Sequence, residues 1–407
     1  MKSVELVARS SYGKLLAFLA AWSGDVASSE DALAEAFEKA LTLWPRKGVP
    51  ENPNAWLVRV AKNKLLDRFR HLKVVGDSEV EIELRESERQ KRITEETWPD
   101  ERLKLLFVCA HPSIDEALHT PLMLQTVLGL EAKTIASSFL VSPATMAKRL
   151  VRAKAKIKHA RIPFEVPSSE KLASRLDAVL AAIYAAYGAS WDLFRGPETS
   201  IDALSDESLY LSETVCQLLP NEPEALGLQA LILFCQARRR SRRTASGAFI
   251  PLEKQDPGLW DQRMIQRAEG MLHSAATLNR LGRFQLEAAI QSAHVARIQS
   301  RPDNWASVLN LYDAVVSLSP STGAQLARVS AILEASGADA AETELARLES
   351  EQDSTLRSYQ PYWALKGEVQ VRSGLLADAK QSLRKAVGLS IDPGVRGYLL
   401  EKIAQLS

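Results

Sequence analysis

The sequence predicts an all-α protein in which two small helical domains precede a domain of stacked helical hairpins. Three observations predict this fold. Apolar residues recur at helical spacing through nearly every segment. Proline and glycine gather at a few places, where they end one helix and separate it from the next. Residues 363–386 fit one copy of a helical repeat, and a length of 407 residues is too great for a single ordinary core.

The first predicted helix spans residues 29–44. Ser28, followed by Asp31 three positions later, is typical of a capping box at a helix start. The apolar residues of the helix are spaced to share one face: Leu33, Phe37, Leu41 and Trp44. A loop should follow, because four residues there do not readily continue a helix: Pro45, Gly48, Pro50 and Pro53.

A second helix is predicted over residues 54–73, with an apolar stripe of Leu57, Ala61, Leu65, Phe69 and Leu72. It carries one acidic residue, Asp67, against six basic residues: Arg59, Lys62, Lys64, Arg68, Arg70 and Lys73. Basic side chains opposite an apolar face can neutralise a row of phosphates. On this segment alone, a solvated charged helix face is an equal alternative.

A linker and a second small domain follow. Residues 76–100 are charged and weakly patterned, which predicts a solvated linker, and residues 101–163 predict a compact domain. Within that domain a short helix is expected over 131–139. Ser142 as N-cap and Pro143 at the first helical position then start a new helix. A brace helix, a tight turn and a capped second helix together indicate a helix-turn-helix motif.

The second helix of this motif is strongly basic. Residues 142–161 hold seven basic residues and no acidic one. The pattern turns Met146, Leu150, Ala153 and Ile157 inward, and Thr145, Lys148, Arg149, Arg152 and Lys156 outward. A membrane surface or an acidic protein could also receive such a helix. The cap, the turn and the brace helix favour DNA.

Residues 170–407 predict a divergent array of helical hairpins. The best match places small and large residues at the spacings of the tetratricopeptide (TPR) repeat: Trp363, Gly367, Gly374, Ala379, Leu383 and Ala386. The small residues let two helices approach, and the large ones fill the next groove. Partial matches occur at 312–320 and near Leu226, and residues 238–260 predict a long interrupting loop.

Charge and composition narrow the class of function. The net charge of +1 conceals an asymmetry, because residues 1–164 hold 26 basic and 21 acidic residues, against 25 and 29 in the rest. The N-terminal part therefore favours a polyanion as its partner. The sequence contains no nucleotide-binding loop, catalytic triad or paired-carboxylate motif, so it predicts no catalytic residue, no cofactor and no enzymatic activity.

Cysteines and targeting signals add two expectations. The three cysteines, Cys109, Cys216 and Cys235, are scattered and form no metal-ligand pattern, so we expect buried thiols and no metal site. The apolar run near the start, residues 15–22, is too short for a membrane helix, and no signal-peptide pattern precedes it. A cytoplasmic protein is therefore expected.

In their order and spacing, residues 8–162 resemble the two domains of extracytoplasmic-function (ECF) sigma factors of bacterial RNA polymerase. Residues 28–44 are similar to the region-two helix that binds the β′ clamp helices. The resemblance implies polymerase contacts at Glu30, Asp31, Glu35 and Phe37. Residues 55–70 resemble the adjoining helix that melts and reads the −10 promoter element. The implied DNA-binding set is Arg59, Lys62, Asn63, Arg68 and Arg70. The loop at 45–54 stands where the family holds a flipped base.

Residues 128–157 resemble region four, which reads the −35 element. The implied contacts are Thr145, Lys148, Arg149 and Arg152. One departure is Leu140, which stands where the family usually has a turn glycine. The partners implied are promoter DNA and core RNA polymerase, through the β′ clamp helices and the β flap, with no membrane.

The remaining chain resembles the TPR-like C-terminal domain of a minority class of ECF sigma factors. The expected fold is thus all-α: sigma region two over 1–75, a linker over 76–100, sigma region four over 101–163 and TPR-like repeats over 170–407. The resemblance implies a non-enzymatic subunit that directs polymerase to promoters, with the repeats regulating it in cis or binding a protein or ligand. Two alternatives stay open: a polymerase-independent helix-turn-helix regulator, and a TPR interaction scaffold.

Overall fold

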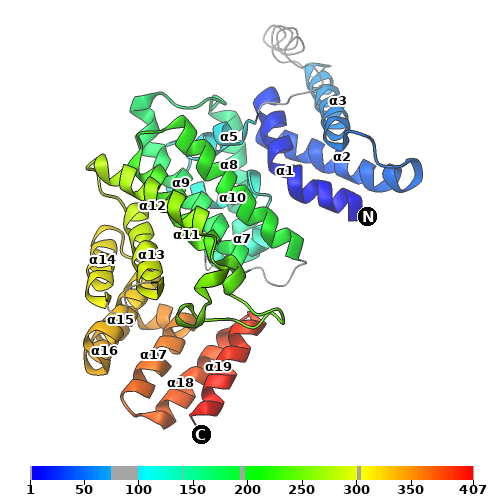
Figure 1. Ribbon diagram of the computed structural model, residues 1–407. Coiled ribbons are helices and arrows are strands. Elements are labelled where there is room, and N and C mark those ends of the chain that lie inside the picture. Colours follow the sequence, from blue (N-terminus) through cyan, green and yellow to red (C-terminus); the bar gives the residue numbers. More distant parts are fainter. Residues whose placement is uncertain (1, 75–99, 140, 193–197, 300–303, 407) are drawn as a thin grey trace. The chain divides into compact units, whose positions relative to one another are not determined.

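The computed structural model of the chain describes residues 2–74, 100–139, 141–192, 198–299 and 304–406 (Figure 1). Within these ranges the regular structure is helical, and the only β-type pairing is an isolated bridge between Arg243 and Phe249. The predicted all-α class is confirmed. The chain divides into two compact units, residues 1–211 and 212–407. None of the described helices combines the length and hydropathy needed to cross a membrane.

A three-helix bundle begins the first unit. It consists of α1 (Lys2–Ser23), α2 (Val26–Lys47) and α3 (Pro53–Val74). Its core includes Leu16, Leu33, Leu57 and Leu65, all fully buried. The predicted helices at 29–44 and 54–73 are therefore present, and α1, which has no counterpart among them, completes the bundle.

Helix α2 begins earlier and ends later than its pattern predicts. Its N-cap is Asp25, whose carboxylate accepts a hydrogen bond from the Ser28 amide at 3.0 Å. The prediction of a capping box at Ser28 is wrong, because Ser28 is already inside the helix. Pro45 does not end the helix either. It lies near the C-terminus, where its missing N–H removes only one of the last intrahelical hydrogen bonds.

The buried face of α2 also differs from the predicted one. Leu41 is 46% exposed, so its prediction as a buried residue is wrong. Three alanines are fully buried instead, together with Leu33: Ala32, Ala36 and Ala40. Small side chains on this face let α2 lie close to its neighbours, and this requirement outweighs the preference for burying a larger leucine.

The rest of the first unit contains the segment predicted to form a helix-turn-helix. Its helices are α5 (Arg102–Cys109), α6 (Glu116–Thr126), α7 (Ala132–Ser138), α8 (Pro143–His159) and α9 (Ser169–Asp192). The next helix, α10 (Glu198–Leu218), begins in this unit. Helix α9 packs on α5 and α6, so part of the segment predicted as repeats lies in the first unit. Residues 76–99 of the linker predicted over 76–100, and the turn residue Leu140, lie outside the described residues.

The second unit is a chain of helices in which most pack against their neighbours in sequence, while α13 packs mainly against α11. It contains α11 (Pro223–Ala237), α12 (Gln262–Thr277), α13 (Arg283–Gln299), α14 (Trp305–Leu318), α15 (Thr322–Ser336), α16 (Ala338–Arg357), α17 (Gln360–Arg372), α18 (Leu376–Leu389) and α19 (Pro393–Gln405). This arrangement, visible from green to red in Figure 1, is that of stacked helical hairpins.

The best sequence match to a repeat forms the hairpin of α17 and α18. A Cβ added to Gly367 would lie 2.7 Å from Cγ of Leu383, so only glycine allows the two helices to approach this closely. Gly374 joins them with a φ of +78°, a conformation that other residues adopt at a cost. Ala379, Leu383 and Ala386 are fully buried, in agreement with the spacing argument.

Between α11 and α12 the chain forms a long connection with three short 3₁₀ turns. Residues 238–243 include five arginines. Arg238 is buried and hydrogen bonds to Gln291, and Arg243 pairs with Asp392. These contacts attach the connection to its own unit. At least these two arginines therefore serve packing.

The prediction of buried thiols is confirmed. Cys109, Cys216 and Cys235 are all buried and unpaired. Burial raises the pKa of Cys109 and of Cys216 to about 12. A thiol with such a pKa is almost entirely protonated near neutral pH and is a poor nucleophile.

The stability of the second unit should fall in mild acid because of His294. Burial, with Arg297 and Arg238 nearby, lowers the pKa of this imidazole from 6.5 to about 4. Below pH 6.5 the unfolded chain binds a proton that the folded chain does not, so stability decreases as pH falls from 6.5 towards 4, by about 1.4 kcal/mol per pH unit. His294→Phe keeps an aromatic ring against Trp305.

Urea unfolding of both proteins at several pH values from 6.5 to 4.5 checks this. The free energy of unfolding of wild type should fall relative to that of His294→Phe as pH is lowered. A difference that is independent of pH would show that His294 does not account for the acid sensitivity.

Candidate nucleic-acid interface

The predicted −10 set lies on α3, but its members have different environments. Asn63 and Arg70 are exposed, and Arg59 is exposed as well. Lys62 instead folds back on the bundle, with its ammonium 5.0 Å from the Phe18 ring and 5.2 Å from the Trp22 ring. Burial lowers the pKa of Lys62 to about 8. In this conformation the Lys62 ammonium is directed towards the two aromatic rings.

Arg68 links the basic face of α3 to the acidic face of α2. Its guanidinium lies 3.1 Å from an oxygen of Asp31 and 3.4 Å from one of Glu35. Lys64 lies 2.7 Å from Glu35, and its hydrogen bond is the main reason that the pKa of Glu35 is lowered. The predicted −10 and polymerase-binding sets are thus brought together. These pairs are exposed, so they contribute little stability and can exchange for partners outside the chain.

Phe37, the aromatic member of the polymerase-binding set, packs against the core of the bundle and is only partly buried. Asp31 is exposed, and Glu35 is intermediate. Helix α2 therefore carries accessible carboxylates and a partly buried aromatic side chain. Such a face suits a partner that is both basic and apolar.

The predicted −35 set lies on α8, where the local sequence determines the helix start. The Ser142 hydroxyl accepts a hydrogen bond from the Thr145 amide at 3.2 Å, and Pro143 occupies the first turn, so both predicted start signals are present. Met146, Leu150, Ala153 and Ile157 are buried, as the periodicity predicts. Four side chains of the predicted set are exposed: Thr145, Lys148, Arg149 and Arg152. A helix N-terminus with this exposed face has the form of a recognition helix.

An ion pair that sequence reasoning missed joins α8 to α2. Lys154, whose side chain is 8% exposed, pairs with the carboxylate of Glu30. Tyr12 also donates a hydrogen bond to Glu30, at 3.3 Å, and its pKa is raised by burial and by this carboxylate. Glu30 is one of the residues predicted to bind polymerase, yet here it is held by Lys154 of α8. The signal in the sequence was Lys154 itself, which lies on the inward side of α8 and needs a buried partner.

A second pair strengthens the same contact. Lys158 lies 2.7 Å from the carboxylate of Asp25, whose side chain is 5% exposed. Burial alone would raise the pKa of Asp25, but the hydrogen bonds from Lys158 and Ser28 outweigh it and the pKa is lowered. The N-cap of α2 is therefore also the anchor for the end of α8.

Close backbone contacts complete this junction between the three-helix bundle and the helix-turn-helix. A Cβ on Gly13 would lie 1.8 Å from the carbonyl oxygen of Val127, so α1 and the end of α6 touch at the level of the main chain. Two residues after Val127, Gly129 lies against the Tyr12 ring, because a Cβ there would be 3.1 Å from its Cδ1 atom. We call these contacts, with the Lys154–Glu30 and Lys158–Asp25 pairs, the α1/α2–α8 junction.

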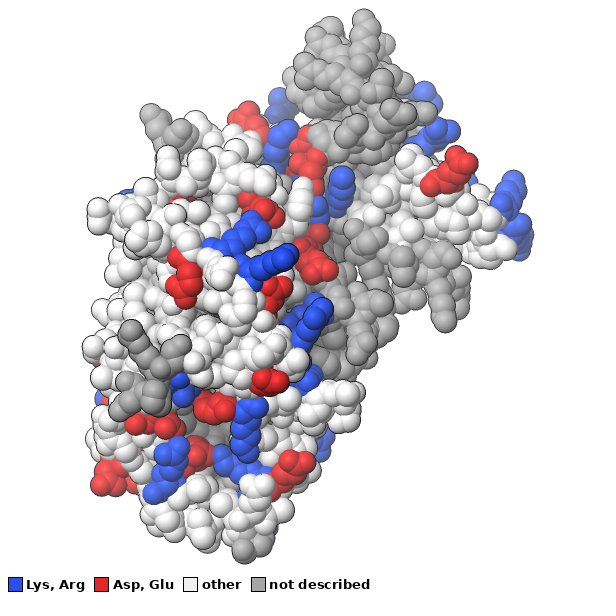
Figure 2. All heavy atoms as spheres, in the orientation of Figure 1, with Lys and Arg blue, Asp and Glu red and all other residues white. Residues whose placement is uncertain are grey.

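Charge on the visible face of the protein is mixed. Figure 2 shows basic and acidic side chains interspersed among uncharged ones, with no broad region of a single sign. Any nucleic-acid interface on this face would therefore consist of short basic stretches.

Comparison with known proteins supports the interpretation of the N-terminal bundle. The sequence profile of sigma-70 region 2 matches residues 7–74, which covers nearly all of α1, α2 and α3. Residues 175–276 match the profile of a family of unknown function (DUF6596). The N-terminal bundle is thus a sigma-70 region 2 domain.

One relative is similar in sequence over nearly the whole chain. The chain is 35% identical over 384 residues to an uncharacterized protein of Rhizobium meliloti (strain 1021). The match covers 93% of this chain and 90% of the relative. No solved structure matches the chain.

Proposed function

The chain belongs to the family of the Rhizobium meliloti protein and carries a sigma-70 region 2 domain, and on this premise we propose that it is an ECF-type sigma factor that directs RNA polymerase to specific promoters. The observation that carries the proposal is the combination of two parts in one compact unit. One part is the region 2 domain, and the other is a capped helix with an exposed basic face, α8.

Each part has a proposed role. The carboxylates of α2 and the partly buried Phe37 bind the β′ clamp helices of the core enzyme. The second small domain binds the β flap. Asn63, Arg59 and Arg70 on α3 contact the opening −10 strand, and Arg149 with Arg152 contacts the −35 duplex. In this scheme the protein is a non-enzymatic, cytoplasmic specificity subunit, and residues 1–75, 76–100, 101–163 and 170–407 are its functional segments.

In the proposed mechanism, binding to core polymerase opens the α1/α2–α8 junction. In the closed form α2 packs against both α3 and α8 and pairs with α8 through Glu30 and Lys154, so the two proposed DNA-binding helices are held against the same neighbour. Core polymerase competes with Lys154 for Glu30, and we propose that this competition drives the opening.

The second unit is proposed to be a TPR-like domain that regulates the first in cis. A truncated chain should retain α9, because this helix packs on α5 and α6. A chain that ends after α10, at Leu218, keeps this helix. Promoter-specific transcription by the truncated chain should differ several-fold from that of the full chain. Equal activity would remove the regulatory role and leave the sigma function standing.

The decisive test is run-off transcription with purified core enzyme and a promoter library. The proposed function predicts transcripts from a defined set of promoters only when both proteins are present. A polymerase-independent regulator would instead bind its operator alone and gain nothing from core enzyme. A TPR scaffold would show no salt-dependent DNA binding.

Arg70 and Lys62 should contribute differently to DNA binding by the complex of this protein with core RNA polymerase. Arg70→Ala removes an exposed cation and should reduce the slope of log affinity against log salt by about 1. Lys62→Met should leave the slope unchanged, because the Lys62 ammonium lies over Phe18 and Trp22. A slope that is reduced by about 1 in both variants would show that Lys62 turns outward on DNA.

A further inference from the structure

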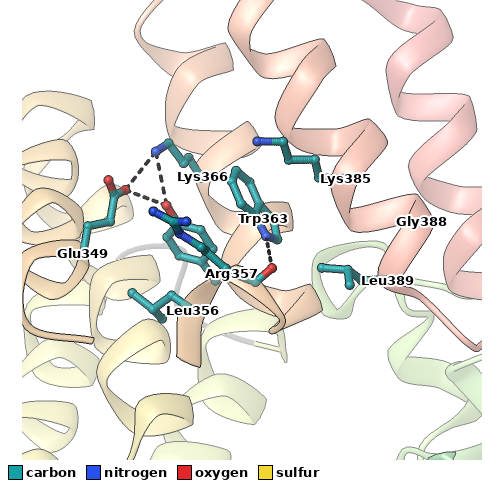
Figure 3. A pocket seen from close by; sticks show the side chains of 9 residues that line it. Glu349, Leu356, Arg357, Trp363, Lys366, Lys385, Gly388 and Leu389 are labelled. Atoms are coloured by element: carbon teal, nitrogen blue, oxygen red, sulfur yellow. Dashed lines mark hydrogen bonds and ion pairs between the residues drawn. The ribbon is translucent and has the colours of Figure 1, made fainter. Parts of the chain in front are cut away.

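The second unit contains a pocket that none of the roles above uses. It has a volume of about 630 Å³ and lies where α16, α17 and α18 meet (Figure 3). This volume is within the range of small-molecule sites, roughly 300–1,000 Å³. Both charged and apolar side chains from all three helices line it.

One wall of the pocket is a fixed aromatic surface. The indole N–H of Trp363 donates a hydrogen bond to the carbonyl oxygen of Arg357 at 3.0 Å, which orients the ring. The Tyr362 ring meets it edge to face, with centroids 4.9 Å apart. Leu356 and Leu389 line other parts of the pocket. The apolar surface is therefore present before any ligand arrives.

The charged groups of the pocket are mostly positive. Glu349 is the one carboxylate among the lining residues, against three cations: Arg357, Lys366 and Lys385. The Glu349 carboxylate accepts hydrogen bonds from the Tyr362 hydroxyl at 2.7 Å and from the Lys366 ammonium at 2.9 Å. The Glu349 carboxylate is thus already engaged on the side of α17, where Figure 3 shows Glu349 and Lys366 close together.

Lys385 supplies the positive charge on the other side. Its ammonium lies 4.0 Å from the centre of the Trp363 ring, and within the described part of the chain it has no carboxylate partner. A cation held over an indole face is positioned by the ring and still has N–H donors to offer. An anion that binds Lys385 would therefore lie beside the apolar surface of Trp363.

From this arrangement we propose that the pocket binds an organic carboxylate that carries an aromatic or branched apolar group. The carboxylate pairs with Lys385 and with the Arg357 side of the pocket, and the apolar group packs on Trp363, Leu356 and Leu389. The same chemistry is found in a free aromatic acid and at the C-terminus of a peptide. The proposal does not depend on the sigma function, because binding can be measured without polymerase or DNA.

Gly388 offers a clean way to block the site. It lies on α18 at the pocket, and a Cβ added there would meet no atom within 4 Å. Gly388→Leu should therefore fill the pocket without disturbing the helices. Gly270→Leu is the matched control, because Gly270 is an exposed helical glycine in the same unit, also with no atom within 4 Å, and it is not among the pocket residues. Thermal unfolding shows whether both variants fold.

Binding is measured by calorimetry on the full chain with N-acetylphenylalanine, its amide and inorganic phosphate. We expect the acid to bind at least tenfold more tightly than the amide or phosphate. Gly388→Leu should abolish binding, Lys385→Gln should weaken it at least fivefold, and Gly270→Leu should leave it unchanged. The proposal is overturned if the amide or phosphate binds as well as the acid, if none of the three binds, or if the folded Gly388→Leu and Lys385→Gln variants bind like wild type.

A second arm identifies the source of the carboxylate. A pentapeptide that ends in phenylalanine with a free carboxylate is compared with N-acetylphenylalanine. If the peptide binds at least tenfold more tightly, the proposed site is supported and its ligand is the C-terminus of a protein. If the peptide binds equally well or more weakly than N-acetylphenylalanine, the proposed site is supported and its ligand is a small aromatic acid.

Discussion

Gly13→Leu is expected to open the α1/α2–α8 junction and to strengthen binding to core RNA polymerase by roughly 5- to 150-fold. Any side chain at this position meets the Val127 carbonyl, since even a Cβ would lie 1.8 Å away, so α1 and α6 must separate. Overpacking of this kind costs about 1–3 kcal/mol. The substitution destabilises only the closed form. Polymerase, which binds the open form, therefore binds more tightly by the same free energy. Helix α1 itself should tolerate the change, because leucine favours a helix more than glycine does.

The opening can be followed by a distance measurement between spin labels. Lys39 on α2 and Lys156 on α8 are exposed, and cysteines placed there can be labelled selectively because the three native thiols are buried. Gly13→Leu should lengthen the distance, and core polymerase should lengthen it in the wild type. Gly188→Leu is the control, since a Cβ on Gly188 meets no atom within 4 Å. An unchanged distance together with an unchanged polymerase affinity in Gly13→Leu would refute the idea of a closed form that competes with polymerase.

The ion pairs of the junction give an independent check. Lys154→Met leaves Glu30 without its buried cation, and removing one partner of a buried pair is costly, at about 3–5 kcal/mol in fully buried cases. Glu30 is 24% exposed, so a smaller loss is expected here. The variant should open the junction as Gly13→Leu does. Its effect on polymerase binding should have the same sign, because Glu30 becomes available to the core enzyme.

Arg149→Ala should cost about 1–3 kcal/mol of promoter discrimination, which is about 5- to 150-fold in the ratio of correct to altered −35 sequences. Arg149 is exposed on α8, six residues after the start of the helix at Pro143, and the helix is fixed by the Ser142 cap and the buried Met146 and Leu150. The guanidinium can form two hydrogen bonds with a guanine edge, and alanine can form none. The fold should be unaffected, because the side chain contributes nothing to the core.

Run-off transcription from paired templates with intact and altered −35 elements measures this ratio. Lys156→Ala is the matched control, since Lys156 is an exposed cation further along the same helix. It should reduce affinity for both templates alike and leave the ratio unchanged. A wild-type ratio in Arg149→Ala would show that α8 does not read the −35 element through this residue.

Much of the first unit could be predicted from local sequence. The start of α8 at Pro143 follows from Ser142 and the proline, because capping and a fixed φ act within one turn. The buried face of α8 follows from its periodicity in the same way. The exposed set of Thr145, Lys148, Arg149 and Arg152 is the complement of that face. These features depend only on neighbours in sequence, so no tertiary information was needed.

The errors and omissions arise where distant segments meet. Leu41 is exposed although its spacing fits the apolar face, because the alanines of α2 are selected by close packing against other helices. Lys62 turns towards Phe18 and Trp22, which lie on a different helix. The pairing of Lys154 with Glu30 joins residues 124 positions apart, and no periodicity encodes such a partner.

The sequence alone determined the helical class, the capped basic helix and the hairpin of residues 363–386, because helix periodicity, capping and glycine conformation are local properties of the chain. Only the tertiary structure decided that Glu30 is held by Lys154, that Gly13 touches the Val127 carbonyl and that Trp363, Lys385 and Gly388 enclose a pocket. These arrangements depend on the free energy of burying surfaces from remote segments against one another. That free energy is a property of the folded chain as a whole, and it cannot be read from any single stretch of the sequence.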